Sequence, residues 1–276
     1  MISRRHSLAL LLCFPASALA ESPAGAFGAS GASGGRGRGG MFRQPDPIDL
    51  SDHAGWSELF DGKSLSGWDG NPEVWKVESG NLVGVYSSQA GTRNRETFII
   101  WKGGEPENFE LKLEIRLEGA ASDSGIQYRS YLTPSAATPP ANQAMSPDRW
   151  SLSGYQFDFN FPNNFTGQVV DGGRGNRGIV SFRSQMVRTE QEKNPRLLST
   201  LGKTEELGAY FKPGEWNQVH LIARGNTLIQ TIDGHVMAIL VDDDSTKARS
   251  KGLIGLQCSG SGPVKISFRN LWLKTL

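Results

Sequence analysis

The central part of the chain alternates apolar and polar residues with a period of two, the pattern of β-strands that bury one face. The clearest run, residues 109–117, places five apolar side chains on one face and charged side chains on the other. Residues 124–130 and 154–159 alternate in the same way. Their polar positions carry Gln127, Arg129, Gln156 and Asp158. Because residues two apart in a strand share a face, these four side chains are expected to lie together on one sheet.

The composition of this polar face favours recognition of a polyol or sugar. A solvated strand face usually carries lysine, glutamate, threonine and serine, whereas this one combines amide, carboxylate and guanidinium groups with flanking aromatic residues. An ordinary solvated face is the alternative interpretation.

Many further short strands are expected between turn residues, and almost no segment has helical periodicity. The strands are expected at residues 56–60, 74–77, 82–86, 179–182, 216–223, 227–232, 235–241, 251–258 and 264–273. Asp233-Gly234 is a two-residue hairpin signal. One short helix is expected at 204–210, and the proline-rich residues 132–148 are expected to form a long insertion. This pattern predicts an all-β antiparallel sandwich.

The N-terminal region predicts export to the periplasm or the extracellular space. Arg4 and Arg5 precede a short apolar run, and Ala18-Leu19-Ala20 resembles a cleavage site, so residues 1–20 are expected to be a signal peptide. Residues 21–53, rich in Gly, Ala and Ser, are expected to form a flexible linker, and residues 54–276 the β-sandwich domain. After cleavage no segment reaches the roughly 20 apolar residues of a membrane span.

Charge and cysteine content narrow the classes of partner. The net charge is +1 and the arginines form no basic stripe, which argues against nucleic acid and favours a small-molecule or oligosaccharide substrate. Of the two cysteines, Cys13 lies in the signal, so Cys258 has no partner for a disulfide or a cysteine-based zinc site.

The usual catalytic motifs are scarce, and the remaining candidates each have a structural alternative. Glu114 and Asp158 are the best-placed carboxylates for glycosidase chemistry, although salt bridges to arginine would also explain them. The run 242–244 offers three carboxylates for calcium or for simple solvation. His220 lies inside an expected strand, where a hydrogen-bonded structural histidine is the more common role.

Seven motifs in order make the chain similar to the 3-keto-disaccharide hydrolase domain family, also described as 3-keto-glucoside 1,2-lyase or 3-keto-2-hydroxyglucal hydratase. The similarity extends from residue 55 to residue 276. The motifs are Trp56–Trp68, Trp75–Gly84, Ser124–Ser130, Gly154–Asp158, Gly214–Asn217, Gly255–Gln257 and Phe268–Asn270.

The resemblance implies a concanavalin-like sandwich, or jelly roll, that cleaves 3-keto-glycosides by elimination and hydration. A C3 ketone acidifies the C2 proton, so one base, one acid and a group that polarises the ketone suffice. It implies Asp158 as a base or metal-side carboxylate and Arg129 as the enolate stabiliser. The implied substrate-binding residues are Gln127, Gln156, Glu114, Arg174 and Gln257. A divalent metal ion is a candidate cofactor, with no ligand set identified.

Gln230 and Ser259 stand where relatives often have histidine, which keeps a second function open. A non-catalytic carbohydrate-binding module on the same fold is the main alternative to an enzyme, and a structural envelope protein is a third. Anomeric preference, aglycone, metal and oligomeric state do not follow from the sequence.

Overall fold

The computed structural model describes residue 49 and residues 51–134, 149–173 and 177–276. The expected signal peptide, most of the expected linker, most of the 132–148 insertion and Arg174 lie outside these residues. The described residues belong to a compact unit, Pro47–Leu276. No helix in them is long and apolar enough to cross a membrane.

The described chain is built almost entirely of strands, with one short helix, α1, at Thr204–Gly208. The strands are β1 (Ser57–Glu58), β2 (Trp68–Gly70), β3 (Trp75–Glu78), β4 (Asn81–Ser87), β5 (Thr97–Trp101), β6 (Phe109–Glu118), β7 (Ser122–Leu132), β8 (Leu152–Asn160), β9 (Val169–Gly172), β10 (Gly178–Ser181), β11 (Gln185–Glu190), β12 (Arg196–Thr200), β13 (Asn217–Arg224), β14 (Thr227–Ile232), β15 (His235–Asp243), β16 (Leu253–Gly260) and β17 (Pro263–Thr275).

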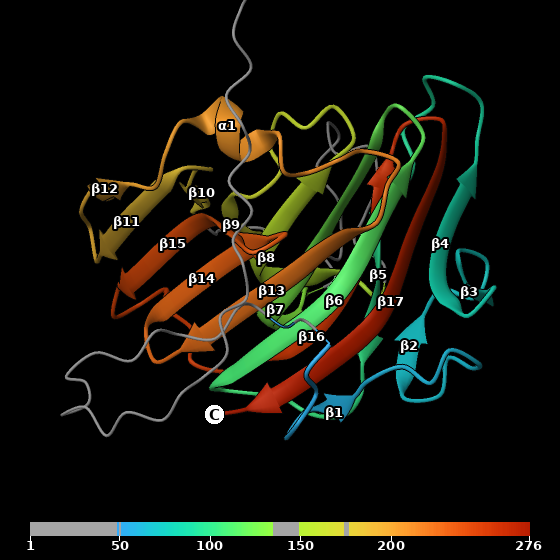
Figure 1. Ribbon diagram of the computed structural model, residues 1–276, viewed down its shortest axis with the longest axis horizontal. Coiled ribbons are helices and arrows are strands. Elements are labelled where there is room, and N and C mark those ends of the chain that lie inside the picture. The colour runs from blue at the N-terminus through green and yellow to red at the C-terminus, as the bar shows by residue number, and fades with distance from the viewer. Residues whose placement is uncertain (1–48, 50, 135–148, 174–176) are drawn as a thin grey trace, which may run out of the picture. The chain divides into compact units, whose positions relative to one another are not determined.

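The strands form two sheets that pack face to face (Figure 1). A ten-stranded sheet has the order β12-β11-β15-β14-β13-β6-β17-β4-β3, with β1 paired to β17. A seven-stranded sheet has the order β10-β9-β8-β7-β16-β5-β2. All pairings are antiparallel except that of β11 with β15. The predicted all-β sandwich of concanavalin-like type is confirmed.

The period-two pattern explains why the two sheets pack together. Along β6 every second residue is buried, and these apolar side chains face the other sheet. The side chains of β7 and β8 that face the other sheet include the aromatic residues Tyr128, Tyr155 and Phe157, all at most 1% exposed. Full burial of one such side chain contributes roughly 1.5–3 kcal/mol. The inner faces therefore supply most of the apolar core, and the polar positions of the two sheets point in opposite directions.

Local signals placed several turns correctly. The hairpin between β14 and β15 turns at Asp233 and Gly234, both with positive φ (46° and 77°), as the Asp-Gly signal predicts. The helix predicted at 204–210 is present but ends at Gly208. The strands β2, β5, β9, β11 and β12 were not predicted. Most of β5 is a continuous apolar run, which carries no alternation to identify it.

The sheets approach closely at Gly84 of β4. A Cβ atom there would lie 2.9 Å from Cys258 Cβ, on the facing sheet, and 2.9 Å from the Trp75 ring. We expect Gly84→Ala to lower the free energy of unfolding by about 1–3 kcal/mol, because neither neighbour can move without disturbing the core. Urea denaturation measures this. Gly172→Ala, whose Cβ would lie no closer than 3.6 Å to another atom, is the control. Equal stability of Gly84→Ala and wild type would show that the sheets are not this close.

Candidate functional site

Polar side chains gather on the outer face of the seven-stranded sheet, over β7, β8 and β16. Gln127 lies directly opposite Gln156, and Asp158 opposite Gly125, in the β7–β8 pairing. Asp123 lies two residues before Gly125, and its partner on β16 is Ser259. Because paired residues of antiparallel strands share a face, these side chains lie on one surface.

A row of hydrogen-bonded amides forms the floor of this surface. Gln127 Nε2 donates to Gln156 Oε1 (3.0 Å), and Gln156 Nε2 donates to Gln257 Oε1 (2.8 Å). Ser130 Oγ donates to Gln127 Oε1 (2.6 Å), and Gln257 Nε2 donates to Glu96 Oε2 (2.7 Å) at the other end. The three glutamines are 1%, 8% and 3% exposed, so their main effect is to rigidify the floor and to hold Glu96.

Gly125 allows this row to cross β7. Gln156 is on β8 and Gln257 is on β16, with β7 between them. A Cβ at position 125 would lie 2.0 Å from Gln156 Nε2. The Gln156 side chain therefore lies flat over the glycine, and no other residue type leaves it this path.

Two carboxyl groups with raised pKa values lie beside the amide floor. Burial raises the pKa of Asp158 to about 7, and the charges of Asp123 and Glu96 act in the same direction. Burial also raises the pKa of Asp123 to about 6, although Arg93 acts against this. We call Asp123 and Asp158 the carboxyl pair. Since they interact, they titrate as a unit, and near neutral pH the pair can hold one proton.

Neighbouring groups distinguish the two carboxyls. Gln168 Nε2 donates to Asp158 Oδ2 (2.8 Å), and no side chain of the described residues donates to Oδ1. The positive charge of Arg93 favours the ionised form of Asp123. The site therefore contains two ionisable carboxyl groups, and the cation of Arg93 acts on one of them. Such an arrangement is suited to proton transfer.

Asp123, Glu96 and Arg93 were missed by the sequence reasoning. Asp123 lies one residue before the predicted strand 124–130. A strand predicted to begin earlier would have placed its side chain on the face of Gln127. Glu96 and Arg93 precede β5 without a periodic pattern, and no local signal identifies them.

Arg129 does not share this face, and the placement predicted for it is wrong. The β7–β8 register shifts between Tyr128 and Tyr131, and Arg129 has a φ of 45°, so the alternation breaks at a bulge. Its guanidinium, in a residue only 1% exposed, donates to three backbone carbonyls. The acceptors are Glu107 (3.0 and 2.7 Å), Gly225 (2.7 Å) and Arg249 (3.1 Å). Arg129 thus ties loops together away from the carboxyl pair.

Glu114 also lies elsewhere, so its expected pairing with Asp158 is wrong. It is on β6 of the ten-stranded sheet, where Arg269 donates to it through Nε (2.8 Å) and Nη2 (2.6 Å) and Asn270 through Nδ2 (2.6 Å). The sandwich therefore separates Glu114 from Asp158. The contacts of Glu114 with Arg269 are those of a salt bridge, which was the alternative interpretation of this residue.

The described histidines contact other parts of the sandwich. His220 Nε2 lies 2.7 Å from Glu110 Oε2 on the ten-stranded sheet, and burial lowers its pKa. His53 stacks on Trp272 of β17. His235 stacks on Tyr210, just after α1. None of these three imidazoles reaches the carboxyl pair.

Arg177 is held in an ion-pair network near β9 and β15. It donates to Asp171 Oδ2 (2.8 Å) and to Asp242 Oδ1 (2.9 Å) and Oδ2 (2.6 Å). The two aspartates are 0% and 3% exposed. Tyr155 and Thr189 also donate to Asp242. Ion pairs with buried aspartates hold the Arg177 guanidinium in place, so its role is structural.

The three carboxylates of the 242–244 run have separate protein partners. Asp242 accepts from Arg177, and Asp243 lies 3.2 Å from Arg188 Nε. Asp244 Oδ1 accepts the backbone N–H groups of Thr246 and Lys247 (both 3.0 Å). The calcium interpretation of this run is therefore not supported by its geometry.

The described residues do not form a set of ligands for a divalent metal. Nowhere in residues 51–134, 149–173 and 177–276 do three carboxylate, imidazole or thiol groups come together as a metal site requires. The carboxyl pair alone offers two such groups.

Residues 230 and 259, where the family resemblance led us to expect histidine, lie in different environments. Gln230 is completely buried between the sheets, where its Nε2 donates to Tyr128 Oη (3.1 Å). Ser259 lies directly opposite Asp123 on the outer face. Only the second position could bring a side chain to the carboxyl pair.

The family model assigns the chain to a carbohydrate-related, hydrolase-like class of β-sandwich domains. The chain belongs to the family described as the 3-keto-alpha-glucoside-1,2-lyase-like domain, whose model matches residues 55–274. A search of curated protein sequences finds no match.

Solved structures with a related chain path share little sequence with this protein. Two Parabacteroides distasonis ATCC 8503 proteins, both provisionally assigned as glycosyl hydrolases, are 17% and 21% identical, each with a TM-score of 0.48. The alignments cover 81% and 80% of this chain and 94% and 99% of theirs. The carbohydrate-binding module CBM66 from Bacillus subtilis is 12% identical, with a TM-score of 0.46 and coverage of 74% and 93%. Similarity at this level says nothing about activity.

The role of Arg129 can be tested through stability. We expect Arg129→Lys to lower the free energy of unfolding by about 2–4 kcal/mol, because an ammonium group cannot reproduce the forked contacts to three carbonyls. Arg196→Lys, at an exposed position of β12, is the control. Wild-type stability of Arg129→Lys in urea denaturation would contradict the structural role.

The carboxyl pair should make stability fall as pH rises. The folded-state pKa values, about 6 and about 7, exceed the unfolded value of about 3.9, so the folded protein binds more protons between these limits. Wild-type stability should therefore decrease from about pH 4 to about pH 7 relative to the Asp123→Asn/Asp158→Asn variant. The difference should reach several kcal/mol, because a change of one in a pKa corresponds to about 1.4 kcal/mol. Parallel pH dependences of the two proteins would contradict the raised pKa values.

Proposed function

We propose that this protein is an exported enzyme that cleaves 3-keto-glycosides by elimination and hydration at the carboxyl pair. The observation that carries the proposal is the pair itself, two half-buried aspartates with pKa values raised to about 6 and about 7 on the face of an amide floor. Membership of the lyase-like family supports the substrate class. A carboxyl pair that shares one proton near neutral pH supplies both the base and the acid that the reaction needs.

The first step in this proposal is elimination. Asp123, which Arg93 keeps ionised, takes the proton from C2, next to the C3 ketone. The C2–H electrons form the enolate, and its collapse breaks the bond from C1 to the leaving oxygen. Asp158, the group with the higher pKa, gives its proton to that oxygen. The products are an alcohol and the unsaturated 3-keto-2-hydroxyglucal.

The second step is hydration of the unsaturated sugar. Asp158, now a carboxylate, accepts a proton from water as the oxygen adds to C1. The proton on Asp123 exchanges with water, and Asp123 then protonates C2, so both carboxyls end in their starting states. The Arg93 guanidinium stabilises negative charge on the C3 oxygen in both steps, the role that the sequence suggested for Arg129.

Export is part of the proposal and rests on residues 1–20. A cleaved secretory signal typically combines basic residues, a short apolar run and a cleavage site of small residues, and residues 1–20 contain all three. The mature enzyme would then meet its glycosides in the periplasm or outside the cell.

A carbohydrate-binding module is the second candidate, and one observation favours it. Ser259 lies opposite Asp123, and the described histidines contact other parts of the sandwich, so no imidazole of the described residues reaches the carboxyl pair. In that case the amide floor and the pair would bind a sugar by hydrogen bonds without breaking a bond.

Leaving-group dependence separates the roles of the two aspartates. We expect Asp158→Asn to lower kcat/KM for methyl 3-keto-glucoside by about 10²–10⁴-fold, because methoxide needs a proton to leave. The same variant should lose far less with 4-nitrophenyl 3-keto-glucoside, since nitrophenolate leaves unprotonated. Asp123→Asn should lose activity with both substrates, because the base is gone. Initial rates of product release measure these effects.

Wild-type activity should follow a bell-shaped pH profile with its limbs near the two pKa values, about 6 and about 7. Glu114→Gln, on the opposite sheet, is the control and should retain activity. If wild-type protein binds these glycosides but releases no product, the binding module is the correct function. If Asp158→Asn lowers kcat/KM equally for both substrates, the assignment of Asp158 as the acid is wrong.

A further inference from the structure

The side-chain hydrogen bonds of Gln127, Gln156 and Gln257, which we call the amide row, all run in one direction. Each glutamine accepts through Oε1 on the side of Ser130 and donates through Nε2 on the side of Glu96. The bonds, in order, are Ser130 to Gln127 (2.6 Å), Gln127 to Gln156 (3.0 Å), Gln156 to Gln257 (2.8 Å) and Gln257 to Glu96 (2.7 Å). Because an amide has oxygen on one side and nitrogen on the other, the orientation of one glutamine fixes that of the next.

At the serine end, the opposite direction would satisfy the same atoms. If all three amides were turned over, Gln127 Nε2 would donate to Ser130 Oγ. The Ser130 hydroxyl could still donate, because the carbonyl oxygen of Tyr128 lies 3.0 Å from it. The serine end therefore accommodates either direction, and the direction is decided at the other end of the row.

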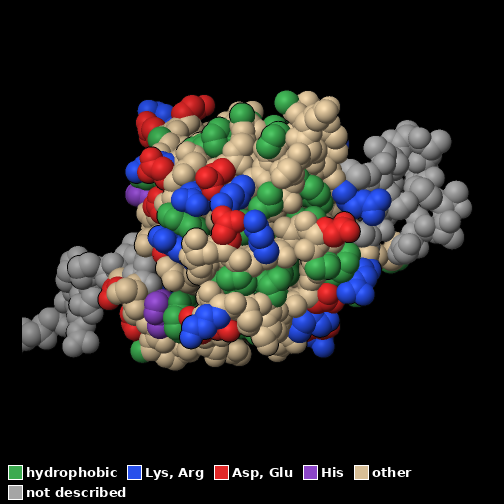
Figure 2. Space-filling view, turned by 90° about the vertical axis from the view of Figure 1, so that its right-hand side faces the viewer, with side chains coloured by type: hydrophobic (Ala, Val, Ile, Leu, Met, Phe, Trp, Pro, Cys, Tyr) green, Lys and Arg blue, Asp and Glu red, His purple; other side chains and the backbone are tan. Residues whose placement is uncertain are grey.

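Glu96 decides the direction of the row. A carboxylate accepts hydrogen bonds and cannot donate one, so Gln257 turns its Nε2 toward Glu96. A bond to a charged acceptor is also stronger than a bond between neutral groups. The side of the sandwich that carries β3 and β4 supplies no field of one sign, because acidic and basic side chains are interspersed there (Figure 2). The direct contact with Glu96 therefore orients the row.

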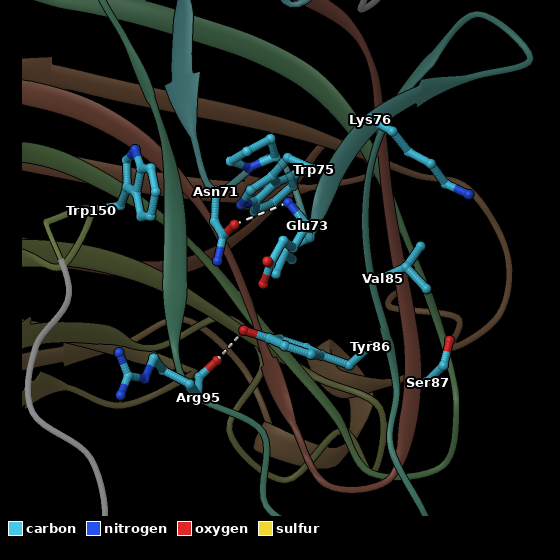
Figure 3. A pocket seen from close by; sticks show the side chains of 11 residues that line it. Asn71, Glu73, Trp75, Lys76, Val85, Tyr86, Ser87, Arg95 and Trp150 are labelled. Carbon is cyan, nitrogen blue, oxygen red and sulfur yellow. Dashed lines mark hydrogen bonds between the residues drawn. The ribbon is translucent and has the colours of Figure 1, made fainter.

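Glu96 is held in place by the chain that precedes it. Tyr86 Oη, on β4, donates to the backbone carbonyl of Arg95 (2.7 Å), the residue next to Glu96 (Figure 3). Asn94 Nδ2 donates to the carbonyl of Gly262 (2.8 Å), in the turn between β16 and β17. These bonds fix the backbone from which the Glu96 side chain extends.

The direction of the row matters because Gln156 Nε2 lies beside the carboxyl pair. A Cβ atom on Gly125 would lie 2.0 Å from this nitrogen, so the nitrogen lies directly over Gly125. Asp158 is the partner of Gly125 on β8, and Asp123 precedes Gly125 by two residues on the same face. The nitrogen uses one N–H for Gln257, and no described residue accepts its second N–H. In a reversed row the amide oxygen, which cannot donate, would take this place.

From this arrangement we propose that Glu96 is a positioning residue, which fixes the direction of the amide row so that Gln156 presents its nitrogen, and not its oxygen, to an oxygen atom of the substrate. The role of Glu96 in the row rests on the hydrogen bonds alone. The contact of Gln156 with the substrate rests on the proposed function and deepens it, because it adds a neutral hydrogen-bond donor to that site.

NMR of the side-chain amides tests the direction of the row without any substrate. In Glu96→Gln the terminal group can donate as well as accept, so the row can reverse, and we expect the amide signals of Gln156 and Gln127 to shift. In Glu96→Gln/Gln257→Glu the row ends in a carboxylate again, and both signals should return toward their wild-type positions. Glu105→Gln, which removes an exposed carboxylate after β5, is the control and should leave them unchanged.

Steady-state kinetics test the contact with the substrate. We expect Glu96→Gln to raise KM for methyl 3-keto-glucoside about tenfold, with a smaller change in kcat, because a binding donor is lost while the carboxyl pair remains. Glu96→Gln/Gln257→Glu should recover a KM close to the wild-type value, and Glu105→Gln should keep it. A thermal melt of each variant checks folding. If the double variant does not fold, the NMR signals of Glu96→Gln decide.

The outcomes distinguish this proposal from the proposed function. Unshifted amide signals of Gln156 and Gln127 in Glu96→Gln would overturn the role of Glu96. Shifted signals with an unchanged KM would overturn the contact of Gln156 with the substrate. If wild-type protein releases no product, the proposed function fails, and the NMR signals still decide whether Glu96 sets the direction of the row.

Discussion

The packing of two sheets through their apolar inner faces is the constraint on which the remaining structure depends. Alternation along each strand sends the polar side chains of one sheet away from those of the other. Asp158 and the glutamine floor are therefore on one surface, whereas Glu114 and His220 are on the opposite one. Any chemistry must be assembled within a single outer face, and on the seven-stranded sheet that face holds the carboxyl pair.

Two departures from regular strand geometry shape this face. Gly125 removes a side chain, so that Gln156 can cross β7 and link the amides into one row. The bulge at Arg129 removes a guanidinium from the face and uses it to hold three loop carbonyls. The result is a rigid floor beside two carboxyls that are partly withdrawn from water. Their raised pKa values follow from this withdrawal, and the charge of Asp123 raises the pKa of Asp158 further. In our proposal these values let one carboxyl act as base and the other as acid.

The sequence predicted the fold far better than the site. Alternation in β6 and the Asp-Gly turn between β14 and β15 depend on neighbouring residues, so they can be recognised locally. The same alternation correctly groups Gln127 with Gln156 and Asp158. It misplaces Arg129, because a bulge shifts the register without a local signal. It also cannot show which sheet a strand joins, so Glu114 seemed close to Asp158, and it cannot bring in Glu96 from a loop.

The most direct test of the central claim, that the carboxyl pair moves a proton at C2, is the reaction of a 3-keto-glycoside in deuterated water. Elimination and hydration exchange the C2 proton with solvent through the aspartates, so the 3-keto-glucose released should carry one deuterium at C2 by mass spectrometry and NMR. An enzyme-free incubation and Asp123→Asn correct for spontaneous exchange. Product that retains its original C2 proton would show direct hydrolysis at C1 and would contradict the account.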